Sequence, residues 1–166
     1  MSYHANIAAA LDLVSQVMPL VWQYLPAARL MIVGKDPSPE LQALTADPRI
    51  NVTGTVPDLR PYLAQATAAI SPMRYGVGIQ NKVLEAMAMA TPVISTPQAV
   101  SAIQIQAGQE ALVADTAEAM AQAIITLLTN EALRRQIGQT GRTYVENHHD
   151  WRGIAEKLEG IYREVI

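Results

Sequence analysis

Short apolar runs alternate with helix-like segments along most of the chain, and no other feature of the sequence limits the fold so strongly. Parallel strands that follow one another need a crossover connection, which is usually a helix. The alternation therefore predicts an α/β fold in which a parallel sheet carries helices on both faces. The predicted strands cover residues 29–34, 50–54, 68–72, 92–96 and 111–114.

The predicted helices begin at residues that suit a helix amino terminus. Ser38 precedes Pro39 at the first helical position, and Asp58 is placed to cap the next helix. Asp115 or Thr116 is placed to cap the helix that follows the last strand. The predicted helices cover residues 5–25, 38–47, 58–66, 80–90, 118–128, 131–147 and 151–165.

The segment 5–25 is apolar enough to raise the question of a membrane span, which needs about 20 mostly apolar residues. Asp12, Gln16, Pro19 and Gln23 interrupt it. Its apolar residues recur every three or four positions, which is typical of one helix face turned toward a protein core. The sequence therefore predicts a buried core helix and no transmembrane segment.

Composition narrows the class of protein. The chain has 166 residues, half of them hydrophobic and 16% charged, which suits a single packed domain over 1–166 with C-terminal helices at about 131–166. A net charge of −3 without a basic stripe argues against nucleic-acid binding. The lack of cysteine excludes disulfides and thiolate metal sites, and it fits a cytoplasmic protein.

The stretch SPMRYGVGIQNKVLEAMAMATPVIST, residues 71–96, places two glycines and several polar residues inside an apolar run. It matches neither common glycine-rich phosphate motif. A dinucleotide fingerprint needs glycine where Asn81 stands, and a phosphate-binding loop needs serine or threonine after its lysine, whereas Val83 follows Lys82.

The same stretch still has the chemistry of an anion site. Glycines at a strand-to-helix turn let the backbone approach a ligand, and the free amides at the start of the next helix favour negative charge. Lys82 and Glu85 are three residues apart and share a helix face. A cation for phosphate and a carboxylate for hydroxyls suit a sugar-containing anion. A solvated lysine–glutamate pair has the same spacing, so the spacing alone leaves both interpretations open.

Three potential metal ligands, His148, His149 and Asp150, are adjacent in the sequence. Adjacent histidines do not converge easily on one ion, and no other cluster of ligand residues accompanies them. We expect a solvated helix end at this position rather than a metal site.

The stretch YGVGIQNKVLEAMAMATPVIST resembles the signature of the carboxyl-terminal domain of group 1 (family 4-like) GT-B glycosyltransferases. The resemblance continues, in the family's order, through LPAARLMIVGKDPSPEL, INVTGTVPDLRPYLAQATAAISPMRYG, ALVADTAEAMAQAIITLL and LRRQIGQTGRTYVENHHDW. It implies a Rossmann-like domain that binds a nucleoside diphosphate sugar, such as a UDP- or GDP-sugar. It also implies an amino-terminal domain for the acceptor, and no metal or other cofactor.

The resemblance assigns roles to individual residues. Glu85 matches the glutamate that hydrogen-bonds the ribose, Gly78 to Gln80 match the turn at the diphosphate or sugar, and Lys82 is placed to reach the phosphates. Thr55, Val56 and Pro57 match the loop whose backbone contacts the base. Gly34 and Lys35 match the turn after the family's second strand, which borders the donor. The donor-binding residues implied in this way are Gly34, Lys35, Thr55, Val56, Pro57, Arg74, Gly78, Ile79, Gln80, Lys82 and Glu85.

The sequence departs from the family pattern in two ways. Val77, preceded by Arg74 and Tyr75, stands where the common pattern has a glutamate that contacts the donor sugar, so we expect a different sugar or a variant donor site. The amino-terminal domain and the first strand of this domain are also expected to be missing. Such a sheet would have a gap beside its centre, which would close up, borrow a strand through self-association, or leave the fold marginally stable.

The function implied by the resemblance is that of the donor-binding half of a retaining glycosyltransferase. Such an enzyme transfers a hexosyl group from a nucleotide sugar during polysaccharide biosynthesis, in the cytoplasm or peripherally at the membrane. We expect little transfer without the acceptor-binding half. The alternatives are a non-catalytic subunit that pairs with a separate amino-terminal chain, an epimerase of nucleotide sugars, and a purely structural domain.

Overall fold

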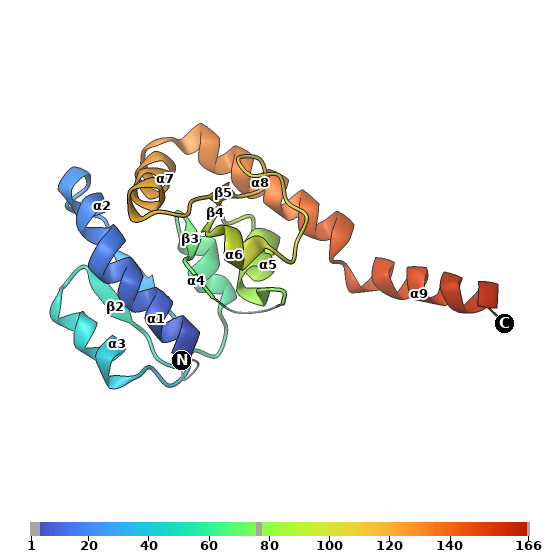
Figure 1. The fold of residues 1–166 in the computed structure, drawn as a ribbon, viewed down its shortest axis with the longest axis horizontal. Coiled ribbons are helices and arrows are strands. Elements are labelled where there is room, and N and C mark those ends of the chain that lie inside the picture. The colour runs from blue at the N-terminus through green and yellow to red at the C-terminus, as the bar shows by residue number, and fades with distance from the viewer. Residues whose placement is uncertain (1–3, 76–77, 166) are drawn as a thin grey trace.

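The computed structural model describes residues 4–75 and 78–165, and the chain enters the fold through one long helix (Figure 1). This helix comprises α1 (His4–Asp12), a π-helical turn (Leu13–Val17) and α2 (Met18–Tyr24). Pro19 has no N–H with which to continue the α-helical ladder. Just before it, the Met18 N–H donates to the Leu13 carbonyl, five residues back, which is the π pattern. The predicted helix is therefore present, with a bulge at its proline.

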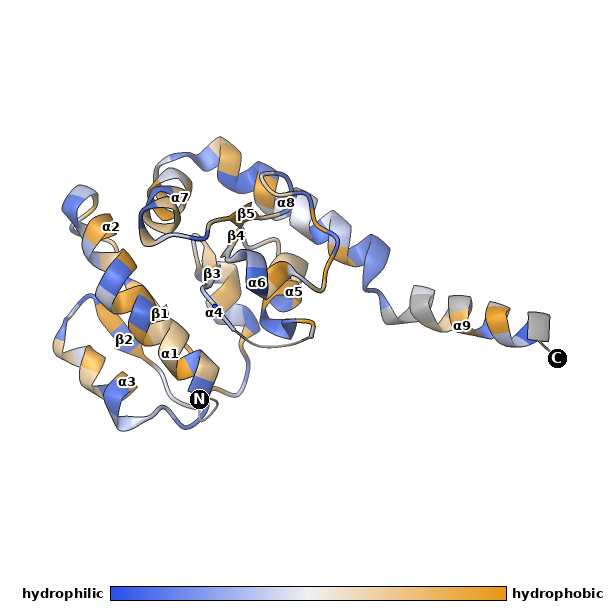
Figure 2. Ribbon diagram, viewed as in Figure 1, coloured by the Kyte–Doolittle hydropathy of each residue, from blue (hydrophilic) through white to orange (hydrophobic). Residues whose placement is uncertain are grey.

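The first helix is a core helix, as predicted. Leu13, Val17, Met18 and Val21 are buried in a hydrophobic cluster shared with strands and with a later helix. Figure 2 shows hydrophilic and hydrophobic residues around this helix, as expected for one buried face. By length and composition alone, His4–Tyr24 would also be able to cross a membrane.

The predicted parallel sheet is confirmed within the described residues, but it is split in two. Strand β1 pairs with β2 in one sheet, and β4 lies between β3 and β5 in the other. Every pair is parallel, with Leu30 opposite Ile50 in the first sheet and Ile70 opposite Ile94 in the second. The strands are β1 (Leu30–Ile32), β2 (Ile50–Val52), β3 (Ala69–Ser71), β4 (Val93–Ser95) and β5 (Leu112–Val113).

The split lies where the sequence predicts a gap. In a doubly wound sheet, one further strand separates the strands that correspond to β1 and β3. Within the described part of the chain, each of these two strands pairs on one side only. Side chains join the two sheets instead, because Ile32 of β1 and Ile94 of β4 belong to one core cluster. Self-association through the unpaired edges stays a prediction.

Helices cover both faces of the strands. Ile94 faces the cluster of the first helix, and its neighbour Val93 packs on the opposite side with buried residues of α5 and α8. Helix α9 extends away from the body (Figure 1). The remaining helices are α3 (Pro39–Ala43), α4 (Arg60–Gln65), α5 (Asn81–Ala88), α6 (Pro97–Val100), α7 (Ala117–Thr129), α8 (Glu131–His148) and α9 (Trp151–Val165).

The predicted caps have different outcomes. Thr116 caps α7, because its hydroxyl accepts the Ala119 N–H at 3.1 Å. Ser38 occupies the N-cap of α3 but makes no capping bond with its side chain. Asp58 lies one residue before the N-cap of α4, and its carboxylate accepts the Arg60 N–H at 2.9 Å. The sequence did not predict α6, which is only one turn long.

Helix α5 packs closely on α8, and glycine makes this approach possible. A Cβ on Gly138 would lie 2.2 Å from the carbonyl oxygen of Ala90, and a Cβ on Gly141 would lie 2.9 Å from that of Glu110. Ala90, two residues after the last residue of α5, is in a left-handed conformation with φ of 54°. The backbone after α5 therefore turns directly against α8.

Substituting Gly138→Ala is expected to lower the free energy of unfolding by about 1–3 kcal/mol, because the added methyl group would displace backbone rather than a mobile side chain. Urea unfolding followed by circular dichroism measures the change. Gly153→Ala in α9 is the matched control, since nothing lies within 4 Å of its Cβ position. If both substitutions changed the free energy of unfolding equally, the close approach of Ala90 to Gly138 would not contribute to stability.

Arg49, next to the first sheet, contacts Trp22 of the first helix. The Arg49 guanidinium lies 3.8 Å from the centre of the Trp22 ring and forms a two-pronged ion pair with Asp47, at 2.6 and 2.9 Å. The hydrogen bonds from Arg49 lower the pKa of Asp47 to about 2, against an ordinary value of 3.8. The backbone of Arg49 also accepts the Leu30 N–H, so the cluster sits where β1 meets β2.

Because the folded pKa of Asp47 is depressed, the ionised carboxylate stabilises the fold above its unfolded pKa, and this contribution is lost as pH falls through about 2. We expect the wild-type protein to melt at a higher temperature than Asp47→Asn at pH 7. The difference should shrink as the pH falls from about 4 toward 2. Differential scanning calorimetry of both proteins across this pH range measures the difference in melting temperature. A difference independent of pH would show that it does not arise from ionisation of Asp47.

Candidate functional site

The predicted donor residues follow the carboxyl ends of successive strands. Gly34 and Lys35 follow β1, the loop 55–57 follows β2, and Arg74 follows β3. The next connection leads into α5. In open α/β sheets, ligands bind in the crevice outside the carboxyl ends of the strands. The chain topology therefore assigns all the predicted residues to the strand end at which a ligand would bind.

The amino terminus of α5 has the geometry of an anion site. Gly78 has φ of +81°, a conformation that favours glycine, and Gln80 is extended at the N-cap position. The Gln80 side chain makes no capping hydrogen bond. Amide groups at an uncapped helix start carry partial positive charge and suit a phosphate.

Lys82 and Glu85 lie on the exposed face of α5, while Val83 and Met87 are buried on its other face. The protein around the Lys82 ammonium lowers its pKa by desolvation, although the residue as a whole remains exposed. The Glu85 carboxylate has no hydrogen-bond or ion-pair partner within the described residues. One partly desolvated cation and one unengaged carboxylate are thus available on the same helix.

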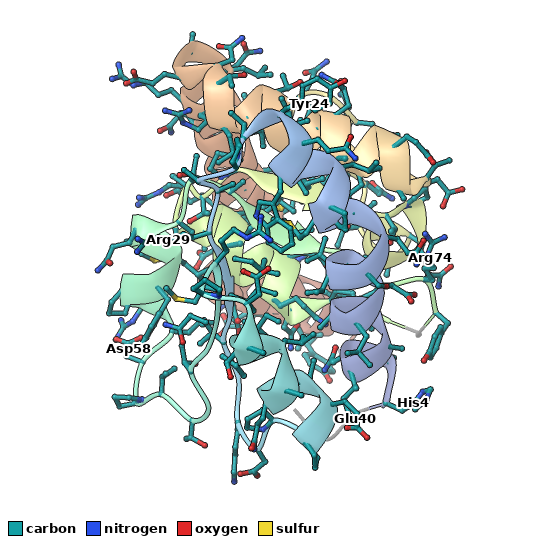
Figure 3. All side chains as sticks on the ribbon, turned by 90° about the vertical axis from the view of Figure 1, so that its left-hand side faces the viewer. His4, Tyr24, Arg29, Glu40, Asp58 and Arg74 are labelled. Carbon is teal, nitrogen blue, oxygen red and sulfur yellow. The ribbon has the colours of Figure 1, made fainter. Side chains whose placement is uncertain are left out.

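The start of α1 also belongs to this region, which the sequence did not predict. Lys82 Nζ donates to Asn6 Oδ1 at 2.6 Å, and the Tyr75 hydroxyl is hydrogen-bonded to His4 Nδ1 at 2.8 Å. Arg74 Nε lies 4.0 Å from an Asp12 carboxylate oxygen. Figure 3 shows His4 at the start of α1 and Arg74 beside this helix. No periodicity or motif signals these contacts, because they join residues about 70 positions apart.

Small side chains let α1 approach the site closely. Ala5 and Ala9 are buried and cluster with Met73, beyond the end of β3, and with Ala99 of α6. Helix α1 also contacts α3, which begins after the turn at Gly34. The first helix therefore runs between the connection that follows β1 and the one that follows β3.

Other predicted residues make no bond to α5 within the described part of the chain. Lys35 lies 3.9 Å from Asp36, and both side chains are largely exposed. Thr55 and Pro57 are exposed in the loop after β2. Val77, the position of the expected sugar-binding glutamate, lies outside the described residues.

The histidine pair near the end of α8 packs against an aromatic ring. The His148 and His149 rings lie 4.7 and 5.5 Å from the ring of Tyr144, measured between ring centres. His148 is the last residue of α8, and His149 follows it as the C-cap. No group of three or more potential metal ligands lies among the described residues.

The strands are parallel and helices cover both of their faces, while the start of α5, beyond the carboxyl ends of the strands, suits an anion. This arrangement defines a Rossmann-like α/β domain. The sequence profile described as Glycosyl transferases group 1 matches residues 2–130, which is most of the chain. The chain belongs to the group 1 glycosyltransferase family. This assignment favours the transferase interpretation over the epimerase and the purely structural alternatives.

One similar protein is the capsular polysaccharide biosynthesis glycosyltransferase CapM from Staphylococcus aureus. It is 29% identical to this chain over 125 residues. The match covers 74% of this chain and 33% of CapM, so the chain spans about a third of that relative's length.

Solved structures share the fold. TarM from S. aureus, in a complex that includes UDP, superposes with a TM-score of 0.79 at 19% identity, over 93% of this chain and 33% of TarM. The C-terminal domain of LpcC, a group 1 family protein from Francisella tularensis, superposes with a TM-score of 0.60 at 15% identity. That likeness covers 79% of this chain and 92% of the LpcC domain. The fold is that of a carboxyl-terminal glycosyltransferase domain.

Proposed function

We propose that this chain is the donor-binding domain of a retaining glycosyltransferase and that it binds a nucleoside diphosphate sugar at the start of α5. The observation that carries the proposal is the uncapped α5 amino terminus with Lys82 and Glu85 on its exposed face. Amide groups and a cation suit the diphosphate, and a carboxylate suits the ribose hydroxyls. The UDP in the TarM complex supports a nucleotide of this class.

The chemical task of such a domain is to stabilise a leaving group. As the glycosidic bond to the donor breaks, negative charge develops on the departing diphosphate. Amide dipoles and an ammonium that are already in place stabilise this charge without reorganising. The Gly78–Gln80 turn would supply the amide dipoles, and Lys82 would supply the ammonium. Glu85 would bind the ribose and in this way position the diphosphate.

We expect the acceptor to be bound by a further domain. The anomeric carbon would face a cleft whose other wall is an acceptor-binding domain, on the same polypeptide or on a separate subunit. CapM serves capsular polysaccharide biosynthesis according to its name, and we propose a related cytoplasmic role for this protein. We expect the acceptor to be a carbohydrate or a carbohydrate-bearing molecule.

Nucleotide binding tests the donor site directly. We expect the chain to bind UDP, GDP or ADP, or one of their sugars, in isothermal titration calorimetry. Glu85→Ala should reduce the binding free energy by about 1.5–3 kcal/mol, because hydrogen bonds to a charged acceptor are lost. The loss should be absent with a ligand that lacks the ribose hydroxyls, such as a dideoxynucleoside diphosphate.

Glu146→Ala is the matched control, since Glu146 is an exposed helical glutamate on α8 and pairs with Arg142. It should leave nucleotide binding unchanged. If the wild-type chain binds no nucleotide, the donor-site proposal fails. If Glu85→Ala binds as tightly as the wild type, the ribose assignment fails while the site itself stands.

Transfer activity is a separate prediction. We expect the 166-residue chain, given a nucleotide sugar that it binds and a panel of saccharide acceptors, to form little or no glycoside, because one wall of the cleft is not supplied. Chromatographic analysis of released nucleoside diphosphate and new glycoside measures this. Turnover by the purified chain alone would contradict the prediction, and retained anomeric configuration in a reconstituted enzyme would support the proposed stereochemistry.

A further inference from the structure

Two cations near the candidate site contact α1 through partners of different charge. Arg74 lies beside the carboxylate of Asp12, so its charge is partly compensated. Lys82 instead donates to the amide oxygen of Asn6, which is neutral. Within the described residues, no ion pair joins Lys82 to a carboxylate.

A neutral acceptor holds an ammonium group without cancelling its charge. An amide oxygen accepts one of the three ammonium hydrogens, which leaves two donors for another ligand. The 2.6 Å Nζ–Oδ1 separation fits a hydrogen bond strengthened by the charge on its donor. Desolvation already lowers the pKa of Lys82, so the ammonium lies where a negative group would be favourable and where Asn6 does not provide one.

We propose that Asn6 is a positioning residue of the donor site, whose amide oxygen holds Lys82 Nζ near the amino terminus of α5 and leaves its charge available to the donor diphosphate. This inference rests on the proposed function, because it concerns the same site. It assigns to α1 a part in ligand binding in addition to its part in the core. Asn6 acts through Lys82 and need not touch the ligand.

A purely structural role for Asn6 predicts a different response to substitution. Aspartate in place of asparagine would keep an acceptor for Lys82 and add an ion pair, so a structural contact would survive or strengthen. In the proposed role, the same aspartate would neutralise Lys82 and repel the diphosphate. Asn6→Asp therefore separates the two roles, because stability and affinity are expected to change independently.

The experiment is titration calorimetry with UDP, GDP and ADP on the wild type, Asn6→Asp, Asn6→Ala, Lys82→Ala and the Asn6→Ala/Lys82→Ala double variant. For the diphosphate that the wild type binds best, we expect Asn6→Asp to weaken binding about tenfold or more, as an added charge near a partly desolvated site would. Its melting temperature should stay equal to that of the wild type or rise. Asn6→Ala should weaken binding less, and it should have no further effect once Lys82 is alanine.

Asn130→Asp is the matched control. Asn130 caps α8 through its side chain and is exposed, and aspartate caps a helix about as well, so this variant adds the same charge elsewhere. It should bind the diphosphate like the wild type.

The outcomes separate the two proposals. If the wild type binds a diphosphate and Asn6→Asp binds it equally well, the positioning role is overturned and the donor site stands. Additive losses from Asn6→Ala and Lys82→Ala would also overturn it. If the wild type binds none of the three diphosphates, the donor site itself is refuted.

Discussion

The position of α5 depends on the contact between its carboxyl end and α8. Gly138 lets the backbone just after α5 approach α8, Gly141 leaves room for the Met87 side chain, and Met87 and Tyr144 fill the adjoining core. A helix fixed at its buried face and at its last turn presents its first turn in one orientation. The amide groups and the Lys82–Glu85 face take their orientation from this packing.

Much of the fold could be predicted from the sequence, because strands and helix starts are marked by residues that are close together along the chain. Apolar runs between helical patterns located the five strands of the described residues. The start of α7 was predicted at Asp115 or Thr116, and Thr116 is the residue that caps it. The split between β1 and β3 follows from the expected strand order rather than from any single residue. The π turn before Pro19 escaped prediction, because proline signals a disturbance of the helix without specifying its form.

The candidate site was less predictable than the fold. Glycine positions and the Lys82–Glu85 spacing indicated the α5 half, since these residues lie close together in the sequence. His4 and Asn6 gave no signal, because their importance depends on contacts with Tyr75 and Lys82 that only the folded chain creates. Sequence patterns report periodicity and short motifs, whereas a polar contact between distant segments leaves neither.

The split sheet also bears on how the fold would open. No strand pairing within the described residues crosses from β1 to β3, so side chains rather than a continuous hydrogen-bonded ladder join the two sheets. Packing of this kind can be lost locally while each sheet keeps its own hydrogen bonds. The β1–β2 unit and the β3–β5 unit would then behave as separate cooperative units in amide hydrogen exchange. The first helix and α7 pack against both units.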